Sequence, residues 1–266
     1  MSTLSARSEA ITRRTYNRPL DDDGTKFETW EQTVRRSHYD HHLRLWEEAG
    51  GTPDVAELEE LNGLGVSRSG TVSGRTLWLG GTEYAYSRSA SQYNCSALNL
   101  CTVFDMVDAF WLLLNGCGVG GKPQSGTLHG YYRRIPELEV VPSERGKDYR
   151  GRKHNIETPP SADNGWVWTI DVGDSAEAWS KTLGKMLVSP RKRVNKLRLV
   201  FTENRGPGGR LRGYGWICNG FLPMANAMTA VHRILNRTAG NLLSEDDIGD
   251  IFNWMGTVLS SRRAAE

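Results

Sequence analysis

Four cysteines, at positions 95, 101, 117 and 218, are the residues of this chain best suited to redox or nucleophilic chemistry. Cys95 stands out because it lies in a polar segment, Ser91-Gln92-Tyr93-Asn94-Cys95-Ser96, whereas a structural cysteine usually lies in an apolar run. A thiol in polar surroundings can act as a nucleophile or as half of a redox disulfide, although a buried inert thiol is the default interpretation. The other three have no such local signal. Without a C-x-x-C pair or zinc-like spacing, all four are expected to be thiols in a reducing compartment.

A glycine-rich segment, Gly116-Cys117-Gly118-Val119-Gly120-Gly121-Lys122-Pro123, nearly fits two nucleotide-binding motifs. It contains G-x-x-x-x-G-K, but Pro123 replaces the Ser or Thr whose hydroxyl would hold magnesium. It also contains G-x-G-x-x-G, yet both motifs need a strand before the loop and a helix after it, whereas a helix is expected before this segment. We therefore interpret it as a tight turn where backbone approaches backbone or a ligand.

Two charged clusters have both a structural and a functional interpretation. His38 and His42 would share a helix face at i, i+4 and could bind a metal, but without a third, distant ligand a solvated face is expected. The basic run from Arg191 to Arg198 follows Pro190. A solvated loop is the expected structure there, with phosphate contact as the alternative.

The elements that must position these residues alternate between strands and helices, which favours the α/β class. Phe104, Val107, Phe110, Trp111 and Leu114 recur on one face of a helix that Asn115-Gly116 should end. Further helices are expected at about 30–49, from 174, at 222–235 and at 244–259, and strands at 76–79, 138–141, 167–172 and 197–201.

Length and composition restrict the function classes. With 266 residues, the chain can form one large domain or two small ones. The net charge of +2 does not indicate a nucleic-acid coat, and no apolar run approaches the roughly eighteen residues of a membrane span. The N-terminus lacks the pattern of a secretory signal, so a cytoplasmic location is expected.

Several short sequence motifs together indicate a family resemblance. In order along the chain they are Arg14–Leu20, Glu28–Arg36, Ser73–Thr82, Asn94-Cys95, Leu114–Gly120, Asp174–Trp179, the stretch from Leu197 to Pro223, and Arg262–Glu266. Together they resemble the adenosylcobalamin-dependent, class II ribonucleotide reductases of the monomeric triphosphate-reductase type. The resemblance covers about residues 14–266.

This resemblance implies an α/β barrel of ten strands built from two five-stranded halves, of which this chain supplies the first. Residues 1–60 would form a mainly helical N-terminal segment. Residues 61–266 would form the half-barrel, with a long surface excursion at about 122–165. We expect the stop after Glu266 to mark the point where a second polypeptide carrying the C-terminal half begins.

The resemblance also implies a reaction. In this family a thiyl radical, generated with the help of adenosylcobalamin, removes the ribose 3′ hydrogen of a ribonucleotide, and two cysteines deliver electrons as the 2′ hydroxyl leaves. Cys95 would be one of that reducing pair, and Asn94 and Ser96 would shape the ribose pocket. The turn with Gly116, Gly118 and Gly120 would let backbone approach substrate or cofactor. The loop with Gly213, Gly215, Trp216, Asn219 and Gly220 would connect an effector site with the substrate site.

The remaining parts of such an enzyme are expected outside this chain. The thiyl cysteine, the second reducing cysteine and the shuttle cysteines belong to the family's second half, so a second polypeptide, a thioredoxin-like reductant and a deoxynucleotide effector are the expected partners. The cofactor would bind mainly through that half. The loop departs from the family at Trp216 and Asn219, which leaves base discrimination open. A non-catalytic nucleotide-binding or regulatory fragment is the alternative, and a nucleic-acid-binding module using residues 191–198 is a weaker one.

Overall fold

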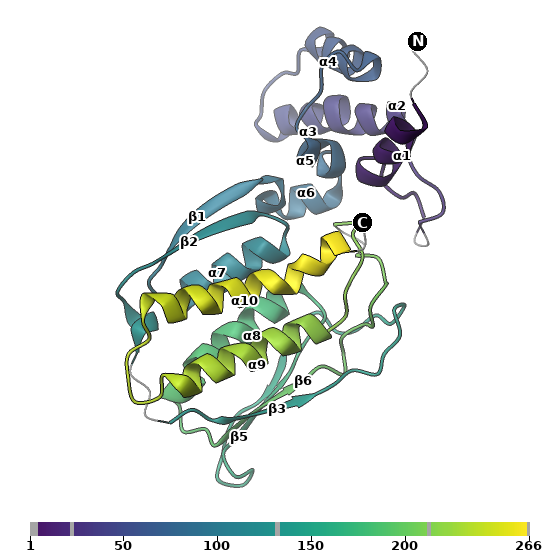
Figure 1. The fold of residues 1–266 in the computed structure, drawn as a ribbon. Coiled ribbons are helices and arrows are strands. Elements are labelled where there is room, and N and C mark those ends of the chain that lie inside the picture. The colour runs from purple at the N-terminus through teal and green to yellow at the C-terminus, as the bar shows by residue number, and fades with distance from the viewer. Residues whose placement is uncertain (1–4, 22–23, 131–133, 212–213, 265–266) are drawn as a thin grey trace. The chain divides into compact units, whose positions relative to one another are not determined.

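The computed structural model describes residues 5–21, 24–130, 134–211 and 214–264, shown as a ribbon in Figure 1. By its contacts the chain forms two compact units. The first comprises Met1–Asn94 and Arg210–Trp216, and the second comprises Cys95–Gly209 and Ile217–Glu266. The boundary between the two units therefore lies between Asn94 and Cys95. The boundary expected after residue 60 concerns where the half-barrel begins, and it stays a prediction.

The first unit is helical. Its elements are α1 (Ala6–Thr15), α2 (Trp30–Val34), the π-helix η1 (Arg35–Asp40), α3 (His41–Glu48), α4 (Val55–Ser67), α5 (Gly74–Leu79), α6 (Glu83–Ser87) and the 3-10 helix η2 (Ser89–Gln92). The first long helix expected from the sequence is confirmed as α2, η1 and α3 in succession. It begins with a capping box, in which the Thr29 hydroxyl accepts from the Gln32 N–H at 3.2 Å and the Gln32 side chain accepts from the Thr29 N–H at 2.8 Å.

The strand expected at 76–79 is wrong, because this segment is the helix α5. Ser73 caps it by accepting from the Thr76 N–H at 3.2 Å. Leu77, Trp78 and Leu79 are all buried, so the segment is covered on several sides. Such consecutive burial looks the same in a short buried helix as in a buried strand, which explains the error.

The segment before α5 is helical as well, since α4 continues through Gly63 and Gly65 to Ser67. A side-chain carbon on Gly65 would lie 2.7 Å from Val34 Cγ1. Glycine is needed there because it lets the two helices approach closely, and this packing compensates for its low helix propensity.

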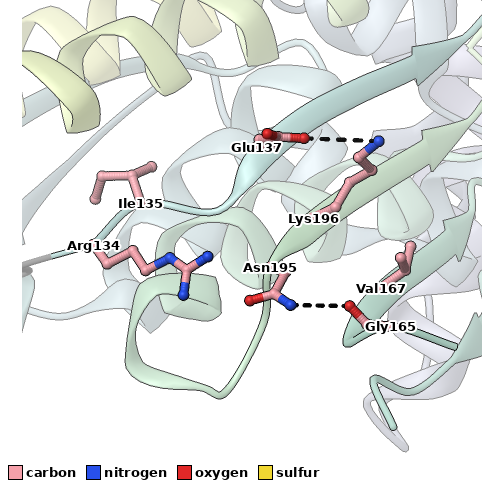
Figure 2. Close-up of a pocket in the computed structure, with 7 residues that line it drawn as sticks. All are labelled: Arg134, Ile135, Glu137, Gly165, Val167, Asn195 and Lys196. Carbon is pink, nitrogen blue, oxygen red and sulfur yellow. Dashed lines mark hydrogen bonds and ion pairs between the residues drawn. The ribbon is translucent and has the colours of Figure 1, made fainter. Parts of the chain in front are cut away.

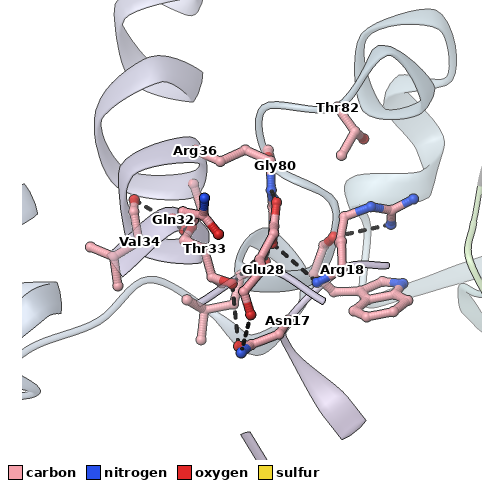
Figure 3. A network of polar contacts seen from close by, with 12 residues as sticks. Asn17, Arg18, Glu28, Gln32, Thr33, Val34, Arg36, Gly80 and Thr82 are labelled. Carbon is pink, nitrogen blue, oxygen red and sulfur yellow. Dashed lines mark hydrogen bonds and ion pairs between the residues drawn. The ribbon is translucent and has the colours of Figure 1, made fainter. Parts of the chain in front are cut away.

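A buried ion pair joins the segments of the first unit (Figure 3). Arg36 Nε donates to Glu28 Oε1 at 2.7 Å, and both side chains are at most 14% exposed. The same guanidinium donates to the carbonyls of Gly80 and Leu77, while Glu28 Oε2 accepts from the Arg18 N–H at 3.0 Å. Burial alone would raise the pKa of Glu28, but the hydrogen bonds and positive charge of Arg36 outweigh it and hold that pKa below its ordinary value.

The second unit contains the strands. Its elements are β1 (Cys95–Leu100), α7 (Val103–Leu114), β2 (Gly118–Pro123), the 3-10 helix η3 (Thr127–His129), β3 (Glu137–Val141), β4 (Ile156–Thr158), β5 (Val167–Asp171), α8 (Ala176–Val188), the 3-10 helix η4 (Ser189–Arg191), β6 (Lys196–Val200), α9 (Leu222–Arg237) and α10 (Glu245–Ala264). The strands and helices expected after residue 100 are thereby confirmed in type and approximate position.

Two parallel crossovers organise this unit. β1 and β2 pair in parallel with α7 between them in the chain, and β5 and β6 pair in parallel with α8 between them. The second sheet has the order β3-β6-β5-β4, in which only β4 is antiparallel to its neighbour. The α/β class is therefore confirmed.

The core lies between the sheets and helices. Trp168 and Ile170 on β5 and Leu197 and Leu199 on β6 are buried at alternating positions, which is the pattern of a sheet with one covered face. The expected apolar face of α7 is rotated, because Phe104 is 80% exposed. The residues of α7 that are buried are Val103, Met106, Ala109 and Phe110.

The half-barrel itself stays a prediction. Five strands of the described residues run parallel to a neighbour, but they are divided between a two-stranded and a four-stranded sheet. The segment 122–165, expected as a long surface excursion, contains the last two residues of β2, the 3-10 helix η3 and the strands β3 and β4.

The Glu28–Arg36 pair should stabilise the chain in a pH-dependent way. Because the pKa of Glu28 is depressed, the stabilisation is present at neutral pH and is lost as the pH falls below about 4.3, the ordinary glutamate value. Glu28→Gln should lower the free energy of unfolding at pH 7 by about 3 kcal/mol, since it leaves Arg36 buried without a counter-charge. Urea unfolding at pH 3 to 7 measures both effects. Glu60→Gln, which changes an exposed carboxylate in α4, is the control.

Candidate functional site

The two-stranded sheet of the second unit has one open face. Along β1 and β2 the exposed positions alternate with more buried ones, because successive side chains of a strand point to opposite faces. The helices α7 and α10 contact the covered side. The residues on the open face are Cys95, Ala97 and Asn99 of β1 and Gly118, Gly120 and Lys122 of β2.

Cys95 is the exposed thiol of this face. It is a free cysteine at the first position of β1, and its partner in register is Gly118, which has no side chain to cover it. The other three cysteines are less accessible, as their sequence context indicated. Cys101 donates to Gln124 at 3.4 Å, and burial raises the pKa of the Cys218 thiol.

Ser96 is not brought to the same face as Cys95. Its hydroxyl accepts from the buried Cys117 thiol at 3.4 Å, on the covered side of the sheet. The expected role of Ser96 in a ribose pocket therefore has no support from its neighbours in this chain, although it stays a prediction. Cys117 is held inward by the same contact.

The backbone conformation at position 116 explains why a glycine is present there. Gly116 lies directly after α7 with a φ of 83°, a conformation that favours glycine. Its N–H donates to the carbonyl of Leu113 at 2.8 Å, and the N–H of Cys117 donates to the carbonyl of Leu112 at 3.0 Å. This double hydrogen bond is the Schellman motif that ends many helices.

Among the residues that the structure describes, none crowds the backbone at Gly120 closely enough to require a glycine there. A side-chain carbon there would meet nothing closer than Ser96 O at 3.9 Å, which is an ordinary contact. At the neighbouring Gly121, by contrast, it would lie 2.6 Å from Leu100 Cδ1 in the core. Packing therefore explains Gly121, whereas Gly120 keeps the open face free of side chains.

Asn94 precedes Cys95 and is also exposed. Its Oδ1 accepts from Arg75 Nε at 3.2 Å. Arg75 was not identified from the sequence as a site residue. The only signal in the sequence was that Arg75 belongs to the motif Ser73–Thr82. Nothing in that motif indicates that Arg75 contacts Asn94.

The expected specificity loop is distributed over both units. Gly213 lies outside the described residues. Gly215 has a φ of 91° and packs against Trp78, and Trp216 contacts Tyr214 with ring centroids 3.7 Å apart. Asn219 and Gly220 belong to the second unit, where Gly220 has a φ of 71°.

The histidine cluster is not a solvated face, so that expectation is wrong. His38 is completely buried, and its Nε2 accepts from the Val72 N–H at 3.3 Å. Burial also lowers the pKa of His41 to about 4. Over the described part of the chain, no group of three or more His, Cys, Asp or Glu residues could hold a metal ion.

The basic run 191–198 is not one solvated loop either. Lys196 and Arg198 lie in β6, and both pair with Glu139, at 3.5 and 3.0 Å. Arg193 lies 3.8 Å from the centre of the Trp166 ring. Two of the positive charges in the run are therefore paired with a carboxylate of a neighbouring strand.

A cavity of about 430 Å³ lies where three parallel strands begin (Figure 2). The first residues of β3, β5 and β6, namely Glu137, Val167 and Lys196, line it. Lys196 pairs with Glu137 at 3.7 Å. None of the residues predicted for the reductase site lines this cavity.

Among the helices that the structure describes, none combines the length and the apolar character that crossing a membrane requires.

Comparisons with known proteins confirm the predicted resemblance. No protein-family model matches the chain. The adenosylcobalamin-dependent ribonucleoside-triphosphate reductase of Lactobacillus gasseri is 26% identical over 96% of this chain, and that of Lactobacillus leichmannii is 25% identical over 96%. A putative adenosylcobalamin-dependent ribonucleoside-triphosphate reductase of Mycobacterium phage D29 is 29% identical over 87%.

The fold is also shared with a solved structure. The crystal structure of a B12-dependent, class II ribonucleotide reductase matches 95% of this chain with a TM-score of 0.70 and 21% identity. The chain spans 40% of that structure and 40% of the L. gasseri protein.

Adjacent glycines of β2 should differ in their tolerance of a methyl group. Gly121→Ala should lower the free energy of unfolding by about 1–3 kcal/mol, because the added carbon overlaps Leu100 in the core. Gly120→Ala should change it by no more than about 0.5 kcal/mol, because it adds a methyl group to an exposed face. Urea unfolding of the two variants provides the comparison, and equal losses would contradict the assignment of the open face.

Proposed function

We propose that this chain forms the N-terminal part of an adenosylcobalamin-dependent ribonucleotide reductase and contributes Cys95 as one of the two cysteines that reduce the substrate. The observation that carries the proposal is the free, exposed thiol of Cys95 on an open, glycine-lined sheet face. It occurs in a chain whose similarity to named ribonucleoside-triphosphate reductases extends over 96% of its length.

The proposed role requires a second thiol. Two thiols together lose two electrons and two protons when they form a disulfide, and the ribonucleotide gains them as its 2′ hydroxyl leaves as water and a C–H bond replaces it. Cys95 would act as the acid that protonates the leaving hydroxyl and as one sulfur of the disulfide. An exposed thiol suits both tasks, because substrate and the second sulfur must reach it.

The open face has room for the reacting part of a nucleotide. Gly118 and Gly120 leave the surface beside Cys95 and Ala97 without side chains, so a ribose can approach the strands closely. Asn94 adds an amide group directly before Cys95. Amide donors and backbone groups suit the hydroxyl oxygens of a ribose.

The second thiol would come from another polypeptide. Cys117 and Cys218 are buried, and the Cys101 thiol donates a hydrogen bond to Gln124. Among the described residues β1 and β2 pair only with each other, so each strand has a free edge that can pair with a further strand. We therefore propose a partner that completes the barrel and presents a thiol to Cys95, together with a thioredoxin-like reductant for the disulfide.

Adenosylcobalamin is the proposed cofactor because the relatives of this chain are named as dependent on it. The described residues fit it as a neighbour, because the small side chains beside Cys95 leave space, although they include no cluster that would hold a metal. When bound, the cofactor supplies the radical that starts the reaction. We propose that the remainder of the enzyme holds it, and that the open face is turned toward it.

Replacing Cys95 should abolish reduction. The chain is co-expressed with a polypeptide carrying the remaining part of the barrel, and deoxyribonucleotide formation is measured with adenosylcobalamin and a dithiol reductant. Cys95→Ser should lower turnover by about a thousandfold or more, because a hydroxyl cannot form the disulfide. Cys101→Ser, a partly exposed cysteine with no proposed role, is the control and should keep the activity.

Full turnover with Cys95→Ser would overturn the role of this cysteine. Nucleotide binding to the isolated chain without turnover in any mixture would favour a non-catalytic nucleotide-binding fragment instead.

The open face should also be needed for binding. Gly120→Val places a branched side chain between the strands' exposed positions without entering the core. Binding of a ribonucleoside triphosphate, measured by equilibrium dialysis, should weaken by about tenfold, which corresponds to about 1.4 kcal/mol. The thermal unfolding midpoint of Gly120→Val should equal that of the wild type. An unchanged affinity for the nucleotide would show that it binds away from this face.

A further inference from the structure

Arg75 connects two segments of the first unit that lie far apart in the chain. It is the second residue of α5. Its Nε donates to Asn94 Oδ1 at 3.2 Å, and its Nη1 donates to the carbonyl of Ser91 at 3.3 Å and to the hydroxyl of Tyr214. One guanidinium thus contacts the residue before Cys95 and a residue of the 210–216 loop segment.

The contact determines which way the Asn94 amide faces. A guanidinium has only donors, so the atom turned toward Arg75 must be the carbonyl oxygen of the amide. The two N–H donors of Asn94 are then turned away from Arg75. Because Asn94 is exposed, these donors are accessible from outside the protein.

Tyr214 anchors the other end. It is 4% exposed, and its carbonyl accepts from Trp78 Nε1 at 2.7 Å. Its ring lies edge-on to that of Tyr84 at 5.8 Å and also contacts Trp216. A loop residue that is held by its ring, its carbonyl and its hydroxyl cannot move without changing the contact at Arg75.

We propose that Arg75 is a positioning residue that couples the position of Tyr214 to the orientation of the Asn94 amide and, through the peptide bond that joins Asn94 to Cys95, to the reactivity of the Cys95 thiol. As a route between loop and active cysteine, this inference rests on the proposed function. As a coupling between Tyr214 and Cys95, it can be tested without turnover.

The coupling needs an arginine. Its planar group presents separate donors to Asn94 and Tyr214 in one rigid frame, so displacement of one partner reorients the donor for the other. A lysine at position 75 would keep the charge, but its single ammonium lies on a flexible stem. Arg75→Lys should therefore retain the fold and lose most of the coupling.

The test is a double-mutant cycle with Cys95 reactivity as its readout. The rate of Cys95 alkylation by iodoacetamide is measured in the full chain, with the products mapped by mass spectrometry. Tyr214→Phe should change this rate by about twofold or more when Arg75 is present. The same substitution should leave the rate unchanged within error in the Arg75→Lys and Arg75→Gln backgrounds.

Two controls separate coupling from a general loss of structure. Arg44→Gln removes a partly exposed arginine of α3 that pairs with Glu48 and Glu83, and Tyr214→Phe should keep its full effect in that background. Circular dichroism and thermal unfolding identify any variant that fails to fold. In that case the Arg75→Lys background decides, because it retains the positive charge.

Equal effects of Tyr214→Phe with and without Arg75, or no effect in the wild-type background, would overturn the inference. A second arm adds ATP or dATP to each variant. Protection of Cys95 by nucleotide in the wild type that weakens in Arg75→Lys would extend the coupling to ligand binding. Absence of any nucleotide effect in the wild type would count against the proposed function and leave the cycle above to decide the role of Arg75.

Discussion

The alternation of side chains along two short parallel strands is the constraint on which the candidate site depends. Because neighbouring residues of a strand point to opposite faces, covering one side of β1–β2 with α7 and α10 leaves every second residue outside. Cys95 falls on the outer series and Ser96 on the inner one. A shift of the strand pairing by one residue would exchange them, so the register that places Cys95 opposite Gly118 is what exposes the thiol.

The first unit contributes rigidity through buried polar contacts. Arg36 and Glu28 pair in the interior and use their remaining hydrogen-bonding groups on backbone of neighbouring segments (Figure 3). Such a pair costs desolvation energy, and it is retained here with its donors and acceptors satisfied. The same organisation recurs at Arg75, whose donors reach Asn94 and Tyr214. Arginines therefore connect the helical segments of this unit to one another and to Tyr214.

Local signals were sufficient for much of the fold. Ser175 before α8 and Gly116 after α7 mark helix ends through hydrogen bonds within a few residues, so the sequence predicted them correctly. The failures share a cause. At 76–79 the burial of consecutive apolar residues, and at His38 the burial of a polar one, depend on what packs against them. The charge of Arg198 looked solvated in the sequence because its partner Glu139 lies on another strand.

The sequence by itself determined the α/β class, the helix ends and, through the order of its motifs, the resemblance to class II ribonucleotide reductases. It also singled out Cys95, because the polar neighbours of a thiol are visible in the chain. Only the tertiary structure decided which face each residue occupies, that Gly120 lacks a packing reason while Gly121 has one, and that Arg75 lies between Asn94 and Tyr214. These facts depend on strand register and on contacts between segments far apart in the chain. Local residue patterns contain no information about either.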